Sequence, residues 1–363
     1  MDSIDPAGPR AAAHDESFVA IERDGLTFPF GERVPGPGEL VPVAPGIGWG
    51  RLPIPGPLRH VNVLALEDGD GVAIVDTGFN TPDCHAGWAA ILAGPLAGRA
   101  VTRVIATHCH PDHVGLAGWF HHQWGAPVWM TRGEWLTIRL MAADARDAVP
   151  AEQVALWRGA GWSDAQIEAA SAQGYSRMRR MLAPLPLGYR RIVEGEVVAV
   201  GDRRFEVVVG SGHSPEHACL LDRANGLLIA GDQVLPRISS NVSLGAGEPW
   251  ADPLGEWLAS LAKLKTLPAG LLVLPGHGEP FHGLHDRCTA LEEEHAGRLA
   301  ALTARLAEPA RVVDCFPQLF RRPIGDDVLG MATGEALAHL RHLEIKGRVA
   351  RDAVDGTWWW RQT

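Results

Sequence analysis

One short segment of the chain carries four side chains that can bind metal. Residues 107–113, with the sequence THCHPDH, hold three imidazoles and one carboxylate within six positions. Imidazole and carboxylate groups together suit zinc, iron or manganese. His108 and His110 are two residues apart, so in an extended segment they project to the same side. A turn at Asp112 and His113 would aim these two at a second ion, so the segment predicts a metal site.

Four ligands cannot satisfy two ions, and three more candidates occur downstream. Each follows an apolar run that predicts a strand, and each has a glycine beside it that lets the backbone turn sharply. One alone would be a weak signal, but their order and their shared position after a strand make them strong together. The three are His213, Asp232 and His277, near the ends of the runs 205–209, 227–230 and 271–274.

This series resembles the metallo-β-lactamase superfamily, in particular its glyoxalase-II-like hydrolase branch. The resemblance rests on the HxHxDH pattern at 108–113, followed by His213, Asp232 and His277. It implies an α/β fold, an αββα sandwich in which two β-sheets carry helices on both outer faces.

The resemblance also implies how the ligands are shared between two divalent ions. Zinc is the expected metal, with iron or manganese as alternatives. Two such ions lower the pKa of a bridging water and polarise the bond to be broken. Asp112 and Asp232 are the expected catalytic carboxylates, Asp112 by orienting the nucleophile and passing a proton to the leaving group. His108, His110 and His213 would hold one ion, and Asp112, His113 and His277 the other, with Asp232 bridging.

Four further residues bear on the site, and two of them, Asp76 and Glu216, have two interpretations each. Asp76, in the sequence VDTG, matches a family motif in which it supports the ligands, but a simple turn residue is equally compatible. Glu216 lies where relatives often have a glycine, and it would touch substrate or cap a turn. His217 is expected to be a structural hydrogen-bonding residue, and Cys109 to pack away from the metals.

The elements that position these residues alternate between β-runs and helices, which is typical of an α/β protein. Residues 60–66 and 71–75 flank the turn DGDG and predict a hairpin. A helix is expected at 82–93, where Gly94-Pro95 ends it. The remaining predicted elements of this part are strands at 101–106, 126–130, 191–200 and 218–221 and a helix at 114–124.

Composition and the pattern of predicted elements divide the chain into three parts, the second of which carries an insertion. Residues 1–22 predict a flexible tail, and 23–285 the catalytic domain. Within it, 133–188 lose the β pattern and predict a helical lid, with Ser163 opening a capping box. Residues 286–363 predict a helical, winged-helix-like module. Its helices are expected at 284–306 and 334–345, and its hairpin at 348–361 around Asp355-Gly356.

The lid is the expected source of substrate specificity. Packing and a solvated helix face explain most of its apolar and basic residues, but an apolar lid with a cationic edge also fits an acyl thioester such as acyl-coenzyme A. The predicted function is hydrolysis of a small-molecule ester or thioester, of the acyl-CoA or acyl-glutathione type. The alternatives are a metal-dependent endoribonuclease or phosphodiesterase, and a lactonase. Candidate lid residues are Met141, Trp157, Arg177, Arg179 and Arg180.

Charge and cysteine content narrow the partners and the compartment. The net charge is −10, and residues 318–363 carry seven Lys/Arg against six Asp/Glu, so no basic face for nucleic acid is predicted. Five widely spaced cysteines without a CxxC pair suit a reducing cytoplasm. The start of the chain does not resemble a secretory signal, and no apolar run reaches membrane-spanning length. We expect a cytoplasmic enzyme with a small-molecule substrate and no nucleic-acid or membrane partner, compatible with a homodimer.

Overall fold

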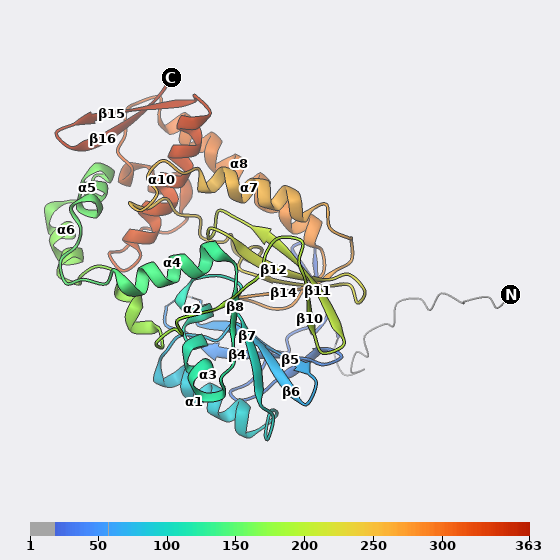
Figure 1. The fold of residues 1–363 in the computed structure, drawn as a ribbon. Helices are drawn as coiled ribbons and strands as arrows, with labels where there is room; N and C mark the ends of the chain where they lie inside the picture. The colour runs from blue at the N-terminus through green and yellow to red at the C-terminus, as the bar shows by residue number, and fades with distance from the viewer. Residues whose placement is uncertain (1–18, 57) are drawn as a thin grey trace.

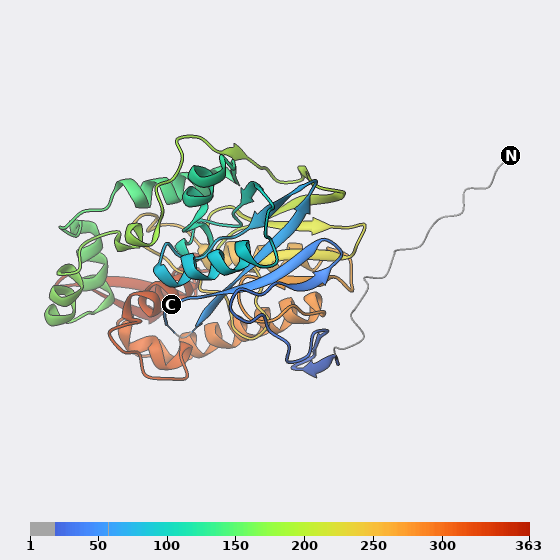
Figure 2. The ribbon, with the colours of Figure 1, turned by 90° about the horizontal axis from the view of Figure 1, so that it is seen from below.

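Two β-sheets face each other at the centre of the molecule, and helices cover their outer faces (Figures 1 and 2). The computed structural model describes residues 19–56 and 58–363. The first sheet has seven strands in the order β3-β4-β5-β6-β7-β8-β9, and the second has five in the order β10-β11-β12-β13-β14. The expected αββα sandwich is therefore confirmed.

The first sheet is antiparallel from β3 to β6 and parallel from β6 to β9. The predicted hairpin at its centre is confirmed as β5 and β6. Helix α1 (Pro82–Ala93) has the bounds predicted from the sequence and connects β6 to the parallel strand β7. The strands are β3 (Val41–Ala44), β4 (Ile47–Pro53), β5 (His60–Asp68), β6 (Gly71–Val75), β7 (Val101–Ile105), β8 (Val128–Met130) and β9 (Arg190–Arg191).

The second sheet is antiparallel except where β13 and β14 run parallel, joined by helix α7 (Pro253–Leu264). Its strands are β10 (Val197–Val200), β11 (Arg203–Gly210), β12 (His217–Asp222), β13 (Leu227–Gly231) and β14 (Leu272–Pro275). The single strand predicted at 191–200 is wrong. The chain leaves the first sheet after Arg191 and enters the second at Val197, because a turn at 192–196 carries it across the sandwich.

Strand β13 shows why these strands are continuously apolar. Leu227 and Ile229 lie in the core between the two sheets, whereas Leu228 and Ala230 face the helices outside. Successive side chains of a strand point to opposite faces, and both faces are covered here. Every residue of the strand is buried as a result.

The insertion is helical, as predicted for residues 133–188. Ser163 and Gln166 form the predicted capping box at the start of α6. The side chain of Trp162, just before it, donates to the Thr333 hydroxyl at 2.9 Å and so ties the insertion to the C-terminal helices. The helices of this part are α4 (Arg132–Ala143), α5 (Ala151–Ala160), α6 (Asp164–Ser171) and the 3₁₀ helix η1 (Arg177–Met181), and two shorter helices precede it, α2 (Pro111–Val114) and α3 (Ala117–Trp124).

The C-terminal residues form helices and then a hairpin, as predicted. Asp355 and Gly356 both have positive φ at its turn. In β16, Trp360 is buried, and the ring of Trp358 packs directly on Gly159 of α5, where a Cβ atom would clash with it. The elements are α8 (Leu284–Arg305), η2 (Val313–Cys315), α9 (Phe316–Leu319), α10 (Leu329–Ile345), β15 (Val349–Val354) and β16 (Thr357–Gln362).

A small hairpin begins the described part of the chain, formed by β1 (Ile21–Arg23) and β2 (Leu26–Phe28). Residues 1–18 of the predicted tail lie outside the described residues, and its last two residues belong to β1. Within residues 19–56 and 58–363, no helix combines the length and apolar character needed to cross a membrane.

Candidate metal centre

The candidate ligands gather at one edge of the sandwich. His108 follows β7, His213 follows β11, and His277 follows β14. Asp232 comes directly after β13, while Asp112 and His113 lie in the short helix α2. Strands β11, β13 and β14 run in the same direction, so their carboxyl ends share an edge and bring these loops together.

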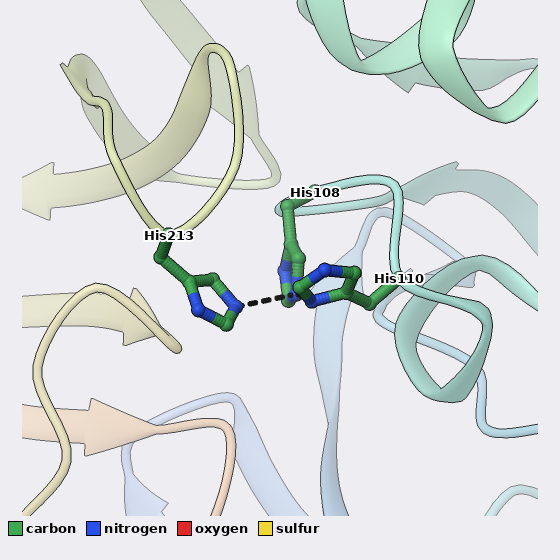
Figure 3. A group of neighbouring side chains, drawn as sticks. All are labelled: His108, His110 and His213. Carbon is green, nitrogen blue, oxygen red and sulfur yellow. Dashed lines mark hydrogen bonds between the residues drawn. The ribbon is translucent and has the colours of Figure 1, made fainter. Parts of the chain in front are cut away.

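Three imidazoles form the first group of side chains (Figure 3). His108 Nε2 lies 2.9 Å from His110 Nδ1 and 3.2 Å from His213 Nε2. The rings come from two different loops and point toward one another. These three nitrogens lie within 4.8 Å of one another, a spacing that allows them to share one ion.

Two imidazoles and a carboxylate form the second group. Oδ2 of Asp112 lies 3.4 Å from His277 Nε2 and 3.5 Å from His113 Nε2. One ligand atom from each of Asp112, His113 and His277 also lies within 4.8 Å of the other two.

Asp232 lies between the two groups and contacts both. Its Oδ2 is 3.3 Å from His277 Nε2 and 3.7 Å from His213 Nε2, and its Oδ1 is 3.5 Å from His113 Nε2. The structure thus brings all seven residues named as ligands from the sequence into one buried cluster.

In two of the rings, His213 and His277, the nitrogen on the far side from the cluster contacts a backbone carbonyl. Nδ1 of His213 lies 2.7 Å from the Asn241 carbonyl oxygen, and Nδ1 of His277 lies 2.7 Å from that of His60. A carbonyl only accepts, so these Nδ1 atoms carry a hydrogen and Nε2 of each ring is the nitrogen that faces the cluster. Metal-bound histidines are oriented in this way.

Asp76 supports two of the ligands. Its Oδ2 lies 2.8 Å from His113 Nδ1 and accepts the Thr107 hydroxyl hydrogen at 2.8 Å. That hydroxyl in turn lies 2.9 Å from His108 Nδ1. Asp76 also turns the backbone, with φ of 58°. Of its two interpretations from sequence, support of the ligands is the one these contacts favour.

Several inward atoms have no hydrogen-bond partner among the described residues. They are Nε2 of His113, Nε2 of His277 and Oδ1 of Asp232, all buried. A buried polar atom left unpaired is costly, and native proteins rarely tolerate one without a reason. A divalent cation at the cluster would be the missing partner, and the nitrogen and oxygen donors suit it. The residues present therefore fit a metal centre.

The two groups differ in charge. Burial, helped by the neighbouring His110, lowers the pKa of His213 to about 4. Burial also disfavours the charged form of His277, but the carboxylates of Asp232 and Asp112 overcome it and raise its pKa to about 10. The metal-free second group therefore holds protons that a cation must displace, as expected of a metal site.

Glu134 of α4 is a positioning residue that the sequence analysis missed. Its buried carboxylate accepts a hydrogen bond from Cys109 N through Oε2 and from Glu216 N through Oε1, both at 2.7 Å. It therefore joins the segment that carries His108 to the segment that follows His213. Nothing local marks Glu134 in the sequence, because both of its partners are distant along the chain.

The contacts of Glu216 and His217 favour structural roles for both residues. Glu216 Oε2 accepts from Gly133 N at 2.7 Å and so caps the start of α4. His217 Nε2 accepts from the Asp232 amide at 3.0 Å, which places its ring behind the cluster. Cys109 is buried in the apolar core, as predicted.

The loop 239–241 is a second feature that the sequence analysis missed. Ser240 donates to the Asp232 carbonyl, and the Asn241 carbonyl holds His213. Behind the loop, the Ser239 hydroxyl lies 2.9 Å from His295 Nε2, and His295 Nδ1 lies 2.9 Å from His339 Nε2. Helices α8 and α10 thus support the loop through a buried chain of hydrogen bonds.

None of the candidate lid residues whose side chains are described belongs to the groups of ligand atoms. Met141 is half-buried against the core of the first sheet, and Trp157 stacks on Trp162 with 5.0 Å between ring centroids. Arg179 and Arg180 are exposed. Arg177 is part of η1, and its side chain lies outside the described part of the structure.

Comparison with known proteins gives two matches to families. The family described as "Metallo-beta-lactamase superfamily" matches residues 56–277, and that described as "Metallo-beta-lactamase-like, C-terminal domain" matches residues 299–363. A solved structure, a beta-lactamase domain protein from Burkholderia ambifaria, is 38% identical with a TM-score of 0.86. The match covers 93% of this chain and 98% of that one.

Two curated relatives are named as thioesterases. An acyl-coenzyme A thioesterase from Gallus gallus is 28% identical, over 66% of this chain and 80% of its own length. An atrochrysone carboxyl ACP thioesterase from Emericella nidulans is 24% identical, over 83% of this chain and 80% of its own length.

Proposed function

The chain belongs to the metallo-β-lactamase superfamily, and from this premise we propose that it is a dinuclear metal-dependent hydrolase of small-molecule thioesters or esters. The observation that carries the proposal is the position of Asp232 between two groups of ligand atoms, within 3.7 Å of histidines in both. The first group is His108, His110 and His213, and the second is Asp112, His113 and His277.

Two divalent ions held there would supply a water with a pKa near neutrality and would stabilise the negative charge that develops on the substrate carbonyl oxygen. Zinc is the proposed metal, since imidazole nitrogens dominate the ligand set. The outward hydrogen bonds of His213 and His277 hold the ligand nitrogens in place before substrate binds, so the site needs little rearrangement.

Asp112 is the proposed proton carrier. Its side chain is 14% exposed, against 8% for Asp232 and 0% for His113, so it is the acid of the cluster that best reaches the substrate side. We assign it the role of accepting a proton from the attacking water and returning it to the leaving group. Asp232, deeper in the cluster, is assigned the bridging position.

Thioesters are the proposed substrate class because two relatives are named for thioester hydrolysis, one on acyl-coenzyme A and one on an acyl carrier protein. The match to this chain covers 80% of the length of each relative. RNA ranks lower. Trp358 and Trp360 pack against α5 and the core and so do not present stacking surfaces for bases.

Metal content and substrate profile test the proposal together. Elemental analysis of the purified protein, of His110→Ala and of Asp232→Ala would be followed by assays on acyl-CoA, acyl-glutathione, a lactone and RNA. His122→Ala is the matched control, since His122 is exposed on α3, outside the cluster. We expect about two metal ions per wild-type chain and loss of thioester cleavage in both cluster variants only. Cleavage of RNA or of the lactone alone would overturn the substrate class, and a folded protein that binds no metal would refute the proposal as a whole.

A further inference from the structure

A groove of about 980 Å³ runs between the insertion and the C-terminal helices. One wall comes from α5, α6 and η1, and the other from the start of α10 and residues 243–245. This volume lies at the upper end of the range of small-molecule sites in proteins.

The apolar lining of the groove is rich in methionine. Three of the six methionines of the chain line it, one of them across from the other two. Methionine side chains are unbranched and flexible, so they adapt to apolar ligands of varying length. The stacked rings of Trp157 and Trp162 add a rigid apolar surface. The methionines are Met178 and Met181 of η1 and Met331 of α10.

Two of these methionines are exposed although they lie in the groove. Met178 is 37% exposed and Met331 is 57% exposed. Leaving apolar side chains in water on two facing walls is unfavourable, and such surfaces commonly mark a binding site.

Both walls continue into segments that carry candidate ligands. The Met181 carbonyl, at the end of η1, lies against Gly115, directly after the helix that carries Asp112 and His113. On the other wall, Ser243 and Leu244 follow Asn241, whose carbonyl holds His213. One end of the groove therefore lies beside segments that carry candidate ligands, although none of the ligands is among the residues that line it.

Two side-chain hydrogen bonds join the walls of the groove. The indole nitrogen of Trp162 donates to the Thr333 hydroxyl at 2.9 Å, and the Gln166 amide donates to Asp326 at 3.3 Å. A preformed groove loses little conformational entropy when a flexible ligand binds.

The charged residues of the groove indicate which part of a thioester substrate it binds. Asp326 and Asp327 lie on the α10 wall, and the facing side carries Arg180. Two carboxylates against one guanidinium disfavour the phosphates of coenzyme A. The apolar acyl chain is the part of the substrate that matches this lining.

We propose that this groove binds the unbranched acyl chain of the substrate, with the bond to be cleaved at the metal centre. This inference rests on the proposed function for the identity of the substrate. It assigns chain-length selection jointly to the insertion and to α10. The more polar thiol-bearing part of the substrate, such as coenzyme A, extends from the metal centre in another direction, away from Asp326 and Asp327.

Binding of fatty acids to the metal-loaded enzyme tests the groove without turnover. Titration calorimetry would compare acetate, hexanoate and dodecanoate, which share a carboxylate and differ only in chain length. Complete burial of one methylene improves affinity by about fourfold at most. We expect dodecanoate to bind at least tenfold more tightly than hexanoate, and equal affinities would overturn the inference.

Substitution of the exposed methionines locates the chain. Met178→Glu and Met331→Glu are expected to weaken dodecanoate binding at least tenfold and to lower the ratio of dodecanoyl-CoA to acetyl-CoA hydrolysis. The control is Leu140→Glu, because Leu140 is 65% exposed in the same insertion but outside the groove. An equal effect of the control, or none in either methionine variant, would refute the inference.

The two proposals can fail separately. The enzyme could bind fatty acids according to chain length, lose this binding in the methionine variants, and yet cleave no thioester. That result would refute the proposed function and support the assignment of the groove to the acyl chain. Thioester cleavage that is independent of chain length in wild type and variants would do the opposite.

Discussion

Oδ2 of Asp76 lies 2.8 Å from Nδ1 of His113, and both side chains are buried. The carboxylate thereby fixes the ring so that Nε2 faces the cluster. The same Oδ2 accepts the Thr107 hydroxyl, which contacts His108, so a single side chain aligns one ligand from each of the two groups.

Asp76→Asn should weaken metal binding by about 10- to 100-fold, the usual effect of removing such a support. Asparagine tolerates the positive φ at this position, so the backbone stays unstrained. Competition with a metal-binding indicator dye measures the affinity, and Asp83→Asn, at an exposed carboxylate of α1, is the control. Equal affinity in the two variants would remove Asp76 from the metal site.

Glu134→Gln should lower the free energy of unfolding by about 1–3 kcal/mol, because an amide keeps only one oxygen acceptor and leaves one of two buried N–H groups unpaired. Urea denaturation of the metal-free protein measures this. The matched variant is Glu216→Gln, whose side chain accepts a single N–H, from Gly133, and can keep that bond. The prediction fails if Glu216→Gln costs as much as Glu134→Gln.

Metal binding should tighten as the pH rises from 6 toward 9. The pKa of His277 is raised to about 10 in the metal-free fold, so a proton must leave before Nε2 can bind a cation. The same raised pKa stabilises the metal-free fold, fully below pH 6.5 and progressively less as the pH rises through about 10. Calorimetry in buffers of different ionisation enthalpy counts the released protons. Metal binding without proton release would contradict the assigned charge of the second group.

The metal-free protein should lose stability as the pH falls from about 6.5 toward 4. Burial lowers the pKa of His295 to about 3 and that of His339 to about 4, so in this window the unfolded chain binds protons that the folded chain does not. His339→Ala removes one of these groups and should make stability less dependent on pH than in wild type. Urea denaturation at pH 7, 6, 5 and 4.5 measures this, with the exposed His122→Ala as control. Parallel pH profiles for wild type and His339→Ala would contradict it.

Asp112→Asn should impair ester hydrolysis more than thioester hydrolysis. A thiol leaves readily as an anion because its pKa is about 8.5, whereas an alkoxide needs a proton during departure. The ratio of the two rates on one preparation is independent of how much metal the variant has lost. Rates that fall equally for oxygen and sulfur analogues of one substrate would exclude Asp112 as the proton donor.

The candidate ligands could be named from sequence because four of them fall within six residues after a predicted strand, and the other three each follow a predicted strand beside a glycine. The hairpin of β5 and β6 and the bounds of α1 depend on local turn and capping signals, and they were predicted correctly. Residues 191–200 were not, since a run of β-forming residues does not show where the chain crosses between sheets.

The supporting contacts could not be predicted, because they join segments far apart in the chain. Glu134 is 82 positions from one of its two partners, and His295 is 44 positions from His339. A buried carboxylate or imidazole resembles any other in the sequence until its neighbours are placed. Only the fold identifies Glu134, His295 and the loop 239–241 as parts of the site.

The insertion is anchored at two places: Glu134 and Glu216 hold α4 to the metal loops, and Trp162 bonds to Thr333 across the groove. A flap hinged at one end would need to break one of these anchors in each cycle. With both anchors in place, an acyl chain would instead enter the groove lengthwise, passing Met178 and Met331. Release of the fatty acid product along the groove, rather than opening of a lid, would then limit the turnover of long-chain substrates.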